Sequence, residues 1–303
     1  MAVTGINAIE TSFVNDYTSN IEMLVQQMGS KIRMACRNES FVGENADFIE
    51  QFGEATAVTR VSRHSDTPLN PIPFDRRWVF PTDKETADLI DKQDRLRQII
   101  DPSNPFARAQ AAAIGRAQDD EIIQKYFGTN QTGQTPSSTA VAFDSNNLIA
   151  ANSLGMTIDK LRDVVQGLEE ADVDFEMERV YCVLTPAQKA DLLATTEVTS
   201  SDYNTVKALV RGELDTFLGM TFITSNRLPG GTKDNSGVTV AANTQRAMAF
   251  AGSGVGFGSW DEISSRMDER ADKSYATQVY TKATFGATRL QEPKCWAIDS
   301  VHT

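Results

Sequence analysis

The residues of this chain that could carry out acid–base chemistry are few. A serine or cysteine hydrolase needs a histidine base that a carboxylate orients, and the only histidines are His64 and the penultimate residue, His302. His64 lies close to Arg63 and Asp66 in a segment rich in proline and polar residues. We expect it to be a solvated loop residue and not a catalytic base.

Metal and thiol chemistry are equally poorly represented. The cysteines Cys36, Cys182 and Cys295 are far apart in the chain, so they form neither a disulfide framework nor a CxxC motif. We expect three buried, unreactive thiols in a reducing compartment. No HExxH or HxxxH motif and no Cys/His cluster offers ligands to zinc. The sequence therefore predicts no catalytic metal and no cofactor.

Alternating glycines from Gly252 to Gly258 invite comparison with a nucleotide-binding loop. The GxGxxG motif requires a sixth-position glycine, where this chain has Phe257 or Ser259, and no GK[ST] follows. We therefore expect a bend or a close-packed turn in a strand.

Three consecutive acidic residues, Asp119 to Glu121, are the densest carboxylate group in the predicted helices. On a helix they point in three directions and cannot chelate one metal together, so we expect a solvated face or a salt-bridge surface. With 29 Lys+Arg and 41 Asp+Glu, the net charge of -12 argues against a surface built mainly to bind phosphate backbones. The sequence predicts a protein that is not an enzyme.

Segment 44–82 is the strongest candidate for an interaction element. The runs TAVTRVS and RRWVF predict two strands, joined by a proline-stiffened loop into a β-hairpin. A lone hairpin is marginally stable, so we expect its support to come from another subunit. The hydrophobic residues that we expect to be buried on neighbours are Phe41, Phe48, Phe52, Ile72, Phe74 and Trp78.

Four arginines flank the same loop: Arg60, Arg63, Arg76 and Arg77. They fit an intersubunit contact with an acidic surface, because arginine pairs bidentately with carboxylates. They fit equally well an ordinary charged edge that prevents strand aggregation. Aromatic residues do not alternate with them, which argues against a single-stranded nucleic-acid platform.

The remaining elements alternate between helix and strand. A capping-box pattern at Thr82 and Glu85 predicts a helix to about Gln98, and Asn104–Pro105 begins a longer helix that ends at Gly128. Later signals are a helix capped by Thr157, a strand RVYCVL, a helix at Thr185–Pro186, and the strands QVYTKATFGATRL and CWAIDSV. We predict an α+β protein whose sheet is completed by its last strands.

The polar leader 1–43 fits one amphipathic helix or an arm lying on a partner. It has no basic residue before Lys31 and no apolar core, so we expect no secretory signal. No stretch reaches the roughly 18 apolar residues that a membrane span needs. We expect a protein made and used in the cytosol, or in something assembled there.

Three segments carry a family resemblance: DKQDRLRQIIDPSNPFARAQAAAIGRAQDDEII, GELDTFLGMTFITSNRLP and DERADKSYATQVYTKATFGATRLQEPKCWAID. In this order, with the leader and the hairpin before them, they resemble the major capsid proteins of tailed bacteriophages. The resemblance implies the Hong Kong 97-type fold and an icosahedral shell around double-stranded DNA. It implies a virion protein that assembles in the host cytoplasm from copies of itself, as pentamers and hexamers.

The resemblance also implies a division into parts. These are an N-terminal arm (1–43), an extended β-hairpin loop (44–82), a peripheral domain with a spine helix (83–139), an axial domain (140–258), and return strands of the peripheral domain (259–303).

This sequence differs from some members of the family in two respects, and each difference changes what we expect of the protein. Some members join subunits covalently through a lysine of the extended loop, but 44–82 contains no lysine, so we expect no such cross-link. Some members begin with a helical scaffolding region, whereas this sequence begins at the arm, so we expect a separate scaffolding protein. A portal, a decoration protein, and packaged DNA bound without sequence specificity complete the implied partners. The alternatives are an encapsulin-like compartment and a soluble α+β enzyme that works with carboxylates.

Overall fold

The computed structural model describes residues 26–43, 46–60, 62–63, 66, 69–90, 103–136, 138–194 and 216–301. The chain divides into two compact units. Unit 1 comprises Met1–Gly29, Lys84–Arg116 and Ile263–Ala283, and unit 2 comprises Ser30–Asp83, Ala117–Glu262 and Thr284–Thr303. The predicted leader helix, His64 and His302 lie largely or wholly outside the described residues.

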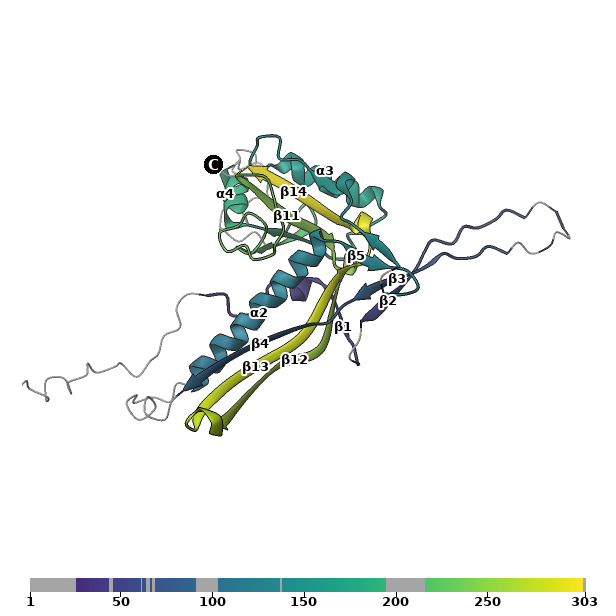
Figure 1. Ribbon diagram of the computed structural model, residues 1–303. Helices are drawn as coiled ribbons and strands as arrows, with labels where there is room; N and C mark the ends of the chain where they lie inside the picture. Colours follow the sequence, from purple (N-terminus) through teal and green to yellow (C-terminus); the bar gives the residue numbers. More distant parts are fainter. Residues whose placement is uncertain are drawn as a thin grey trace, which may run out of the picture. The chain divides into compact units, whose positions relative to one another are not determined.

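A six-stranded mixed sheet forms the core of unit 2 (Figure 1). Its order is β7 (Leu148–Ile149), β14 (Cys295–Val301), β11 (Thr244–Ala251), β8 (Val180–Leu184), β10 (Met220–Thr224) and β9 (Thr216–Phe217). Strand β11 is antiparallel to both of its neighbours, whereas β8 is parallel to β10 and β14 is parallel to β7. Of the last strands predicted to complete the sheet, CWAIDSV (β14) belongs to this sheet, whereas QVYTKATFGATRL belongs to a second sheet described below.

Helices α3 (Ile158–Glu170) and α4 (Pro186–Ala194) begin at the predicted signals. The Thr157 hydroxyl caps α3 by accepting from the Lys160 backbone N–H. Apolar side chains at helical spacing then face the sheet, and three of them, Leu161, Val164 and Leu168, are completely buried. The amphipathic pattern therefore identified both the helix and its packing face.

Helix α2 (Ser103–Phe127) ends before Gly128, as the sequence predicts. In unit 2, Ile122 and Ile123 are completely buried, and the Tyr126 hydroxyl lies 2.9 Å from the carbonyl oxygen of Ala249 in β11. In unit 1, the Gln110 side chain donates to the carbonyl of Val279, at 3.2 Å. Contact on more than one side explains why α2 lacks a single apolar stripe.

A second sheet has the order β1 (Arg37–Ser40), β12 (Val255–Arg270), β13 (Ala276–Arg289) and β4 (Thr82–Ile90). The long strands β12 and β13 run side by side (Figure 1). In β12, a Cβ atom on Gly256 would lie 2.9 Å from the Ile49 side chain, and one on Gly258 would collide with the Phe41 ring. The glycine spacing therefore serves close packing, as predicted.

Strand β4 corrects the helix predicted from Thr82 and Glu85. The Thr284 hydroxyl donates to Asp83 at 2.6 Å, and the Tyr280 hydroxyl donates to Glu85 at 2.8 Å. The carboxylates of this segment therefore accept hydrogen bonds from residues of β13, far along the chain. Pairing with β13 stabilises a strand here more than the capping box stabilises a helix. The rest of the predicted helix, 91–98, lies outside the described residues.

A third sheet contains the base of the hairpin, in the order β2 (Asp47–Phe52), β3 (Phe74–Val79), β5 (Asn130–Thr132) and β6 (Thr139–Val141). The RRWVF strand is confirmed. The strand predicted at TAVTRVS (56–62) is wrong, because its described residues are extended but unpaired, and Asp47–Phe52 is the strand instead. The periodicity of TAVTRVS is real, but among the described residues no strand pairs with it. Five short 3-10 helices complete the described structure: η1 (Arg33–Ala35), η2 (Ser145–Asn147), η4 (Gly252–Gly254), η5 (Ala271–Lys273) and η6 (Glu292–Lys294).

Of the two expectations for the three acidic residues of α2, the solvated face is wrong, because Asp119 and Glu121 are buried, whereas ion pairs are present at Asp120 and Glu121. Asp119 is completely buried and accepts from the backbone N–H groups of Lys31 and Ile32, both at 3.1 Å. Asp120 forms a bidentate pair with Arg227. Each of these two carboxylates accepts hydrogen bonds from residues that are far away in the sequence and lie beside it only in the folded chain.

All three cysteines are buried, and burial raises the pKa of each thiol far above its ordinary value. In the described ranges, no three His, Cys, Asp or Glu side chains are grouped so that they could hold a metal ion. No helix among the described residues is long and apolar enough to cross a membrane.

Candidate subunit interface

The hairpin of β2 and β3 separates its side chains onto two faces. The antiparallel register pairs Phe48 with Trp78, Glu50 with Arg76 and Phe52 with Phe74, and the residues between them face the other way. Because side chains alternate along a strand, these three pairs form a row along one face, here called the ladder face.

The opposite face of the hairpin packs on the body of unit 2. Ile49 and Val79 are 5% and 0% exposed and contact the buried Leu290, with Phe41 and Trp260 packed against them. This apolar cluster holds the base of the hairpin in place.

Arg77 lies on this packed face, 8% exposed, with its Nη1 3.8 Å from Oε1 of Glu292. Glu292 also pairs with the completely buried Arg289, which donates to the carbonyl of Gly128, at 3.2 Å, beyond the end of α2. The carbonyls at a helix C-terminus attract a cation. The hairpin base, α2 and the β13–β14 connection are therefore joined through buried charges.

The ladder face alternates aromatic and ionic pairs. Phe48 and Trp78 meet edge to face with ring centroids 5.2 Å apart, and Phe52 and Phe74 do the same at 5.3 Å. Between them, Arg76 pairs with Glu50 at 3.3 Å. The Arg76 guanidinium also lies 4.5 Å from the Phe48 ring centroid and 5.5 Å from that of Phe74. Such pairs stabilise a two-stranded ribbon and keep its aromatic rings in fixed positions.

Exposure rises steeply along the ladder face away from the body. Trp78 is 8% exposed, and its indole N–H donates to the Gly133 carbonyl at 2.8 Å. At the far end, Phe74 is 49% exposed and Phe52 is 73% exposed. Two aromatic rings of one pair are therefore presented to solvent at an ordered position.

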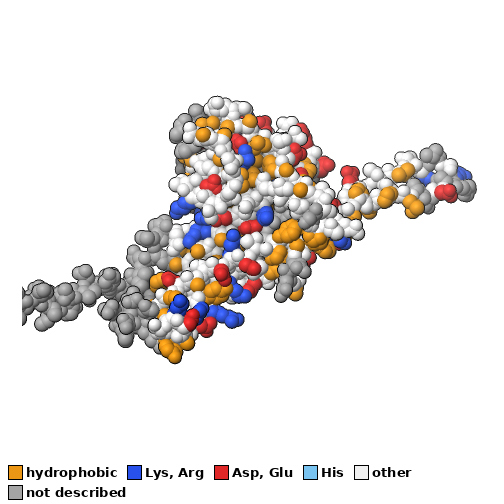
Figure 2. All heavy atoms as spheres, viewed as in Figure 1, with side chains coloured by type: hydrophobic (Ala, Val, Ile, Leu, Met, Phe, Trp, Pro, Cys, Tyr) orange, Lys and Arg blue, Asp and Glu red, His pale blue; other side chains and the backbone are white. Residues whose placement is uncertain are grey.

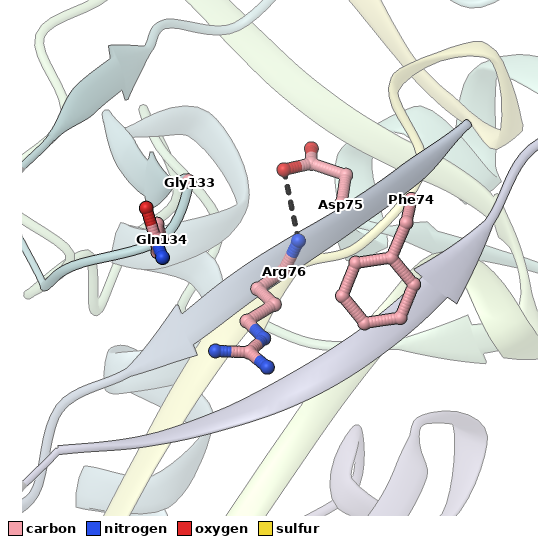
Figure 3. A pocket seen from close by; sticks show the side chains of 5 residues that line it. All are labelled: Phe74, Asp75, Arg76, Gly133 and Gln134. Carbon is pink, nitrogen blue, oxygen red and sulfur yellow. Dashed lines mark hydrogen bonds between the residues drawn. The ribbon is translucent and has the colours of Figure 1, made fainter.

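A pocket of about 290 Å³ adjoins the same end of β3 and is lined by Phe74, Asp75, Arg76, Gly133 and Gln134 (Figure 3). The Asp75 and Arg76 side chains point away from each other (Figure 3). The Asp75 carboxylate accepts from the Thr132 hydroxyl at 2.6 Å and from the Arg76 backbone N–H at 2.8 Å. Of the five residues that line this pocket, Asp75 is the one carboxylate, and it already accepts these two hydrogen bonds.

Beyond Phe52 and Phe74 the two arms of the hairpin project from the body, and hydrophobic side chains lie along them (Figures 1 and 2). Among the described residues, the outermost backbone hydrogen bond between the two arms runs from the Gly53 N–H to the Pro73 carbonyl, at 2.7 Å. Val58, Leu69 and Ile72 are 60%, 96% and 52% exposed. The sequence interpretation did not single out Val58 or Leu69, although both lie in the segment that it identified.

The predicted interface residues differ in how much of each side chain is exposed to solvent. Phe52, Ile72, Phe74, Arg60 and Arg63 are exposed. A second group, Phe41, Phe48 and Arg76, is half-buried.

The expected burial of Trp78 on a neighbour needs correction, because its own chain covers it and its indole donates to Gly133, just after β5. Arg77, expected either at an intersubunit contact or on a charged edge, is buried in its own chain near Glu292 of the β13–β14 connection.

Comparison with known proteins gives one family and many similar folds. A family model described as phage capsid protein matches residues 9–301. No curated protein matches the chain.

Among solved structures, the capsid of the cyanophage P-SCSP1u has a TM-score of 0.73 and 13% identity, covering 97% of this chain and 94% of that one. The acidic stable capsid of Helicobacter pylori bacteriophage KHP30 has a TM-score of 0.70 and 11% identity, covering 99% and 98%. A Gordonia phage Cozz chain has a TM-score of 0.70 and 14% identity, covering 100% and 96%. At such identities the likeness shows a shared fold, the Hong Kong 97-type fold of phage capsids.

Proposed function

Because this chain belongs to the phage capsid protein family and is a major capsid protein, we propose that its projecting hairpin holds the shell together by packing on a neighbouring copy. The exposed pair of Phe52 and Phe74 is the observation that carries this proposal. Burying one such ring fully is worth roughly 1.5–3 kcal/mol. Repeated at every contact of a closed lattice, that contribution makes a durable container.

We assign the parts of the chain as the sequence suggests, with an N-terminal arm (1–43), an extended loop (44–82), a peripheral domain (83–139 and 259–303) and an axial domain (140–258). Copies would meet around fivefold and sixfold axes of an icosahedral shell. Head-to-tail contacts of this kind, in which one patch meets a different patch, close into rings when the rotation permits.

The experiment that tests the hairpin contact is the double variant Phe52→Ser/Phe74→Ser, with Met177→Ser as its matched control. Met177 is 89% exposed and lies outside the hairpin. We expect the double variant to fold as the wild type does, because both rings are exposed in the single chain, and to need a much higher concentration to assemble. Electron microscopy and sedimentation measure assembly. Normal particles at wild-type concentrations would refute the contact.

A shortened hairpin tests the same proposal without changing the ladder face. Replacing residues 54–72 by Asn-Gly together with Pro73→Thr keeps the hydrogen bond from the Gly53 N–H to the carbonyl of residue 73, and the N–H gained at position 73 lets a favoured two-residue turn close the hairpin. We expect folded subunits that remain soluble and form no shells. The whole segment 44–82 is unsuitable for deletion, because β2 and β3 belong to the body's own sheet.

The remaining partners follow from the same role. We propose that the shell assembles in the host cytoplasm with a separate scaffolding protein and a portal, and that a decoration protein is an optional addition. We propose that it encloses double-stranded DNA without sequence-specific contacts, since a net charge of -12 disfavours a DNA-binding lining. Nuclease-protected DNA in purified particles tests this. A cargo enzyme in place of DNA would instead indicate an encapsulin-like compartment.

A further inference from the structure

We propose that the ammonium group of Lys160 is a built-in structural cation, enclosed by four backbone carbonyl oxygens. It fixes the turn 151–155 and caps the open edge of β14, and the site accepts a free alkylammonium ion when the lysine side chain is removed. Helix α3, the turn and β14 all belong to unit 2. The inference does not depend on the proposed hairpin contact.

The Lys160 side chain is 5% exposed and ends among oxygen atoms. Its Nζ lies 3.0 Å from the carbonyl oxygen of Ala151, 3.2 Å from that of Leu154, 3.0 Å from that of Gly155 and 2.9 Å from that of Asp299. These four oxygens are here called the carbonyl cage. An ammonium group has three N–H donors and no lone pair, so it suits the cage. A neutral amine would turn its lone pair toward an oxygen.

The position of Lys160 on α3 is unfavourable for a cation by local rules. Lys160 lies one turn before the buried Val164, on the side of α3 that packs against the sheet. It also lies in the first turn, where the helix dipole disfavours positive charge. Burial lowers the pKa of Lys160, and the carboxylates of Asp299 and Asp191 oppose that shift. The carbonyl cage supplies the hydrogen bonds that compensate for these costs.

The turn that provides three of the oxygens has an unfavourable backbone. Asn152 has a φ of 49° and Ser153 has a φ of 57°. Left-handed conformations are costly for residues other than glycine, so contacts with other elements must stabilise the turn. Within it, the Leu154 N–H donates to the Ala151 carbonyl at 2.9 Å. Lys160 binds three carbonyls of the turn at once and thereby joins it to α3.

The fourth oxygen belongs to a sheet edge that has no strand beside it. Strand β7 pairs with two residues of β14, the first of which is Ala297, and no strand among the described residues continues this edge. Because backbone direction alternates along a strand, Asp299 and Val301 face the same edge. Lys160 donates to the Asp299 carbonyl, and the Val301 N–H donates to the Leu154 carbonyl at 2.9 Å. The ammonium and the turn therefore occupy an edge whose unpaired groups could otherwise bind another strand.

The variant Lys160→Met tests whether the carbonyl cage needs a cation. Methionine fills a similar volume but donates no hydrogen bond, so each of the four oxygens loses a donor. We expect the melting temperature of the unassembled subunit to fall by about 5–10 °C. We expect the Val301 amide to exchange about tenfold faster or more. Lys233→Ala, at an exposed lysine of unit 2, is the control and should change neither value. A wild-type melting temperature for Lys160→Met would overturn the proposal.

The variant Lys160→Ala tests the identity of the bound group. The truncation removes three carbons and the ammonium, which together correspond to n-propylammonium. We expect propylammonium chloride to restore at least about half of the lost melting temperature, compared with sodium chloride at equal ionic strength. It should not stabilise Lys160→Met, in which methionine fills the site. Tetramethylammonium, a cation without an N–H donor, is the negative control. No recovery with propylammonium, or equal recovery with tetramethylammonium, would overturn the proposal.

The variant Ser153→Gly keeps the proposal testable if Lys160→Ala does not fold. Glycine adopts the left-handed conformation readily, so the turn should then depend less on Lys160. We expect Ser153→Gly to raise the melting temperature of Lys160→Met by more than it raises that of the wild type. Equal increases in the two backgrounds would show that Lys160 does not stabilise the turn, and would overturn the proposal.

Discussion

Removing the buried carboxylate of Asp119 should release residues 30–32 from helix α2. Asp119 is 0% exposed and accepts from the Ser30 hydroxyl at 2.5 Å and from the N–H groups of Lys31 and Ile32 at 3.1 Å. In Asp119→Ala these three donors lose their acceptor; the hydrogen bond from Ile32 is buried and the other two are partly buried, and an unsatisfied buried donor costs about 1–3 kcal/mol. Water entry and relaxation offset part of that cost, so we expect a loss of about 3–5 kcal/mol.

The conservative variant Asp119→Asn keeps one acceptor oxygen and loses the charge. Because charge-assisted hydrogen bonds are about twice as strong as neutral ones, we expect a smaller loss of about 1–2 kcal/mol. Asp159→Ala, at an exposed carboxylate of α3, serves as the control and should change stability by less than about 0.5 kcal/mol. The side chain of Asp159 is 82% exposed.

Urea unfolding of the unassembled subunit measures these differences, and hydrogen exchange reports on the Lys31 and Ile32 amides directly. The expected order of stability is wild type, then Asp119→Asn, then Asp119→Ala. If Asp119→Ala unfolds within about 0.5 kcal/mol of wild type, with both amides still protected, the reasoning is refuted.

Three further predictions follow from other contacts. Arg289→Met should cost about 3–5 kcal/mol in thermal unfolding, because it removes a completely buried cation from its carboxylate and carbonyl partners; a neutral effect would contradict this. Gly258→Ala should cost about 1–3 kcal/mol by overpacking against Phe41, and the pairing with Phe41→Ala should recover part of it. Hydrogen bonds from Arg33 lower the pKa of Glu262 below its ordinary value of 4.5. Its contribution to stability is therefore present above pH 4.5 and declines as the pH falls through the lowered pKa, so the acid-side slope of stability should be shallower in Glu262→Gln, and an unchanged slope would disprove it.

Local signals in the sequence determined the elements whose formation depends on neighbours in the chain. Gly128 follows the last residue of α2, Asn104–Pro105 lies in its first turn, and Thr157 caps α3, because capping depends on a few adjacent residues. The sequence also contains no HExxH or GK[ST] motif, which can be read directly from residue types and their spacing. These features, with the order of the segments, were sufficient for the resemblance to phage capsid proteins.

Tertiary structure decided everything that depends on a partner far along the chain. Thr82–Ile90 is a strand because Tyr280 and Thr284 lie beside it, and Asp47–Phe52 pairs where TAVTRVS does not. Trp78 is covered because Gly133 lies 55 residues further along the chain and accepts its indole N–H. A capping box or an alternating run states only what a segment can form, and the contacts that choose among these options exist only in the folded chain.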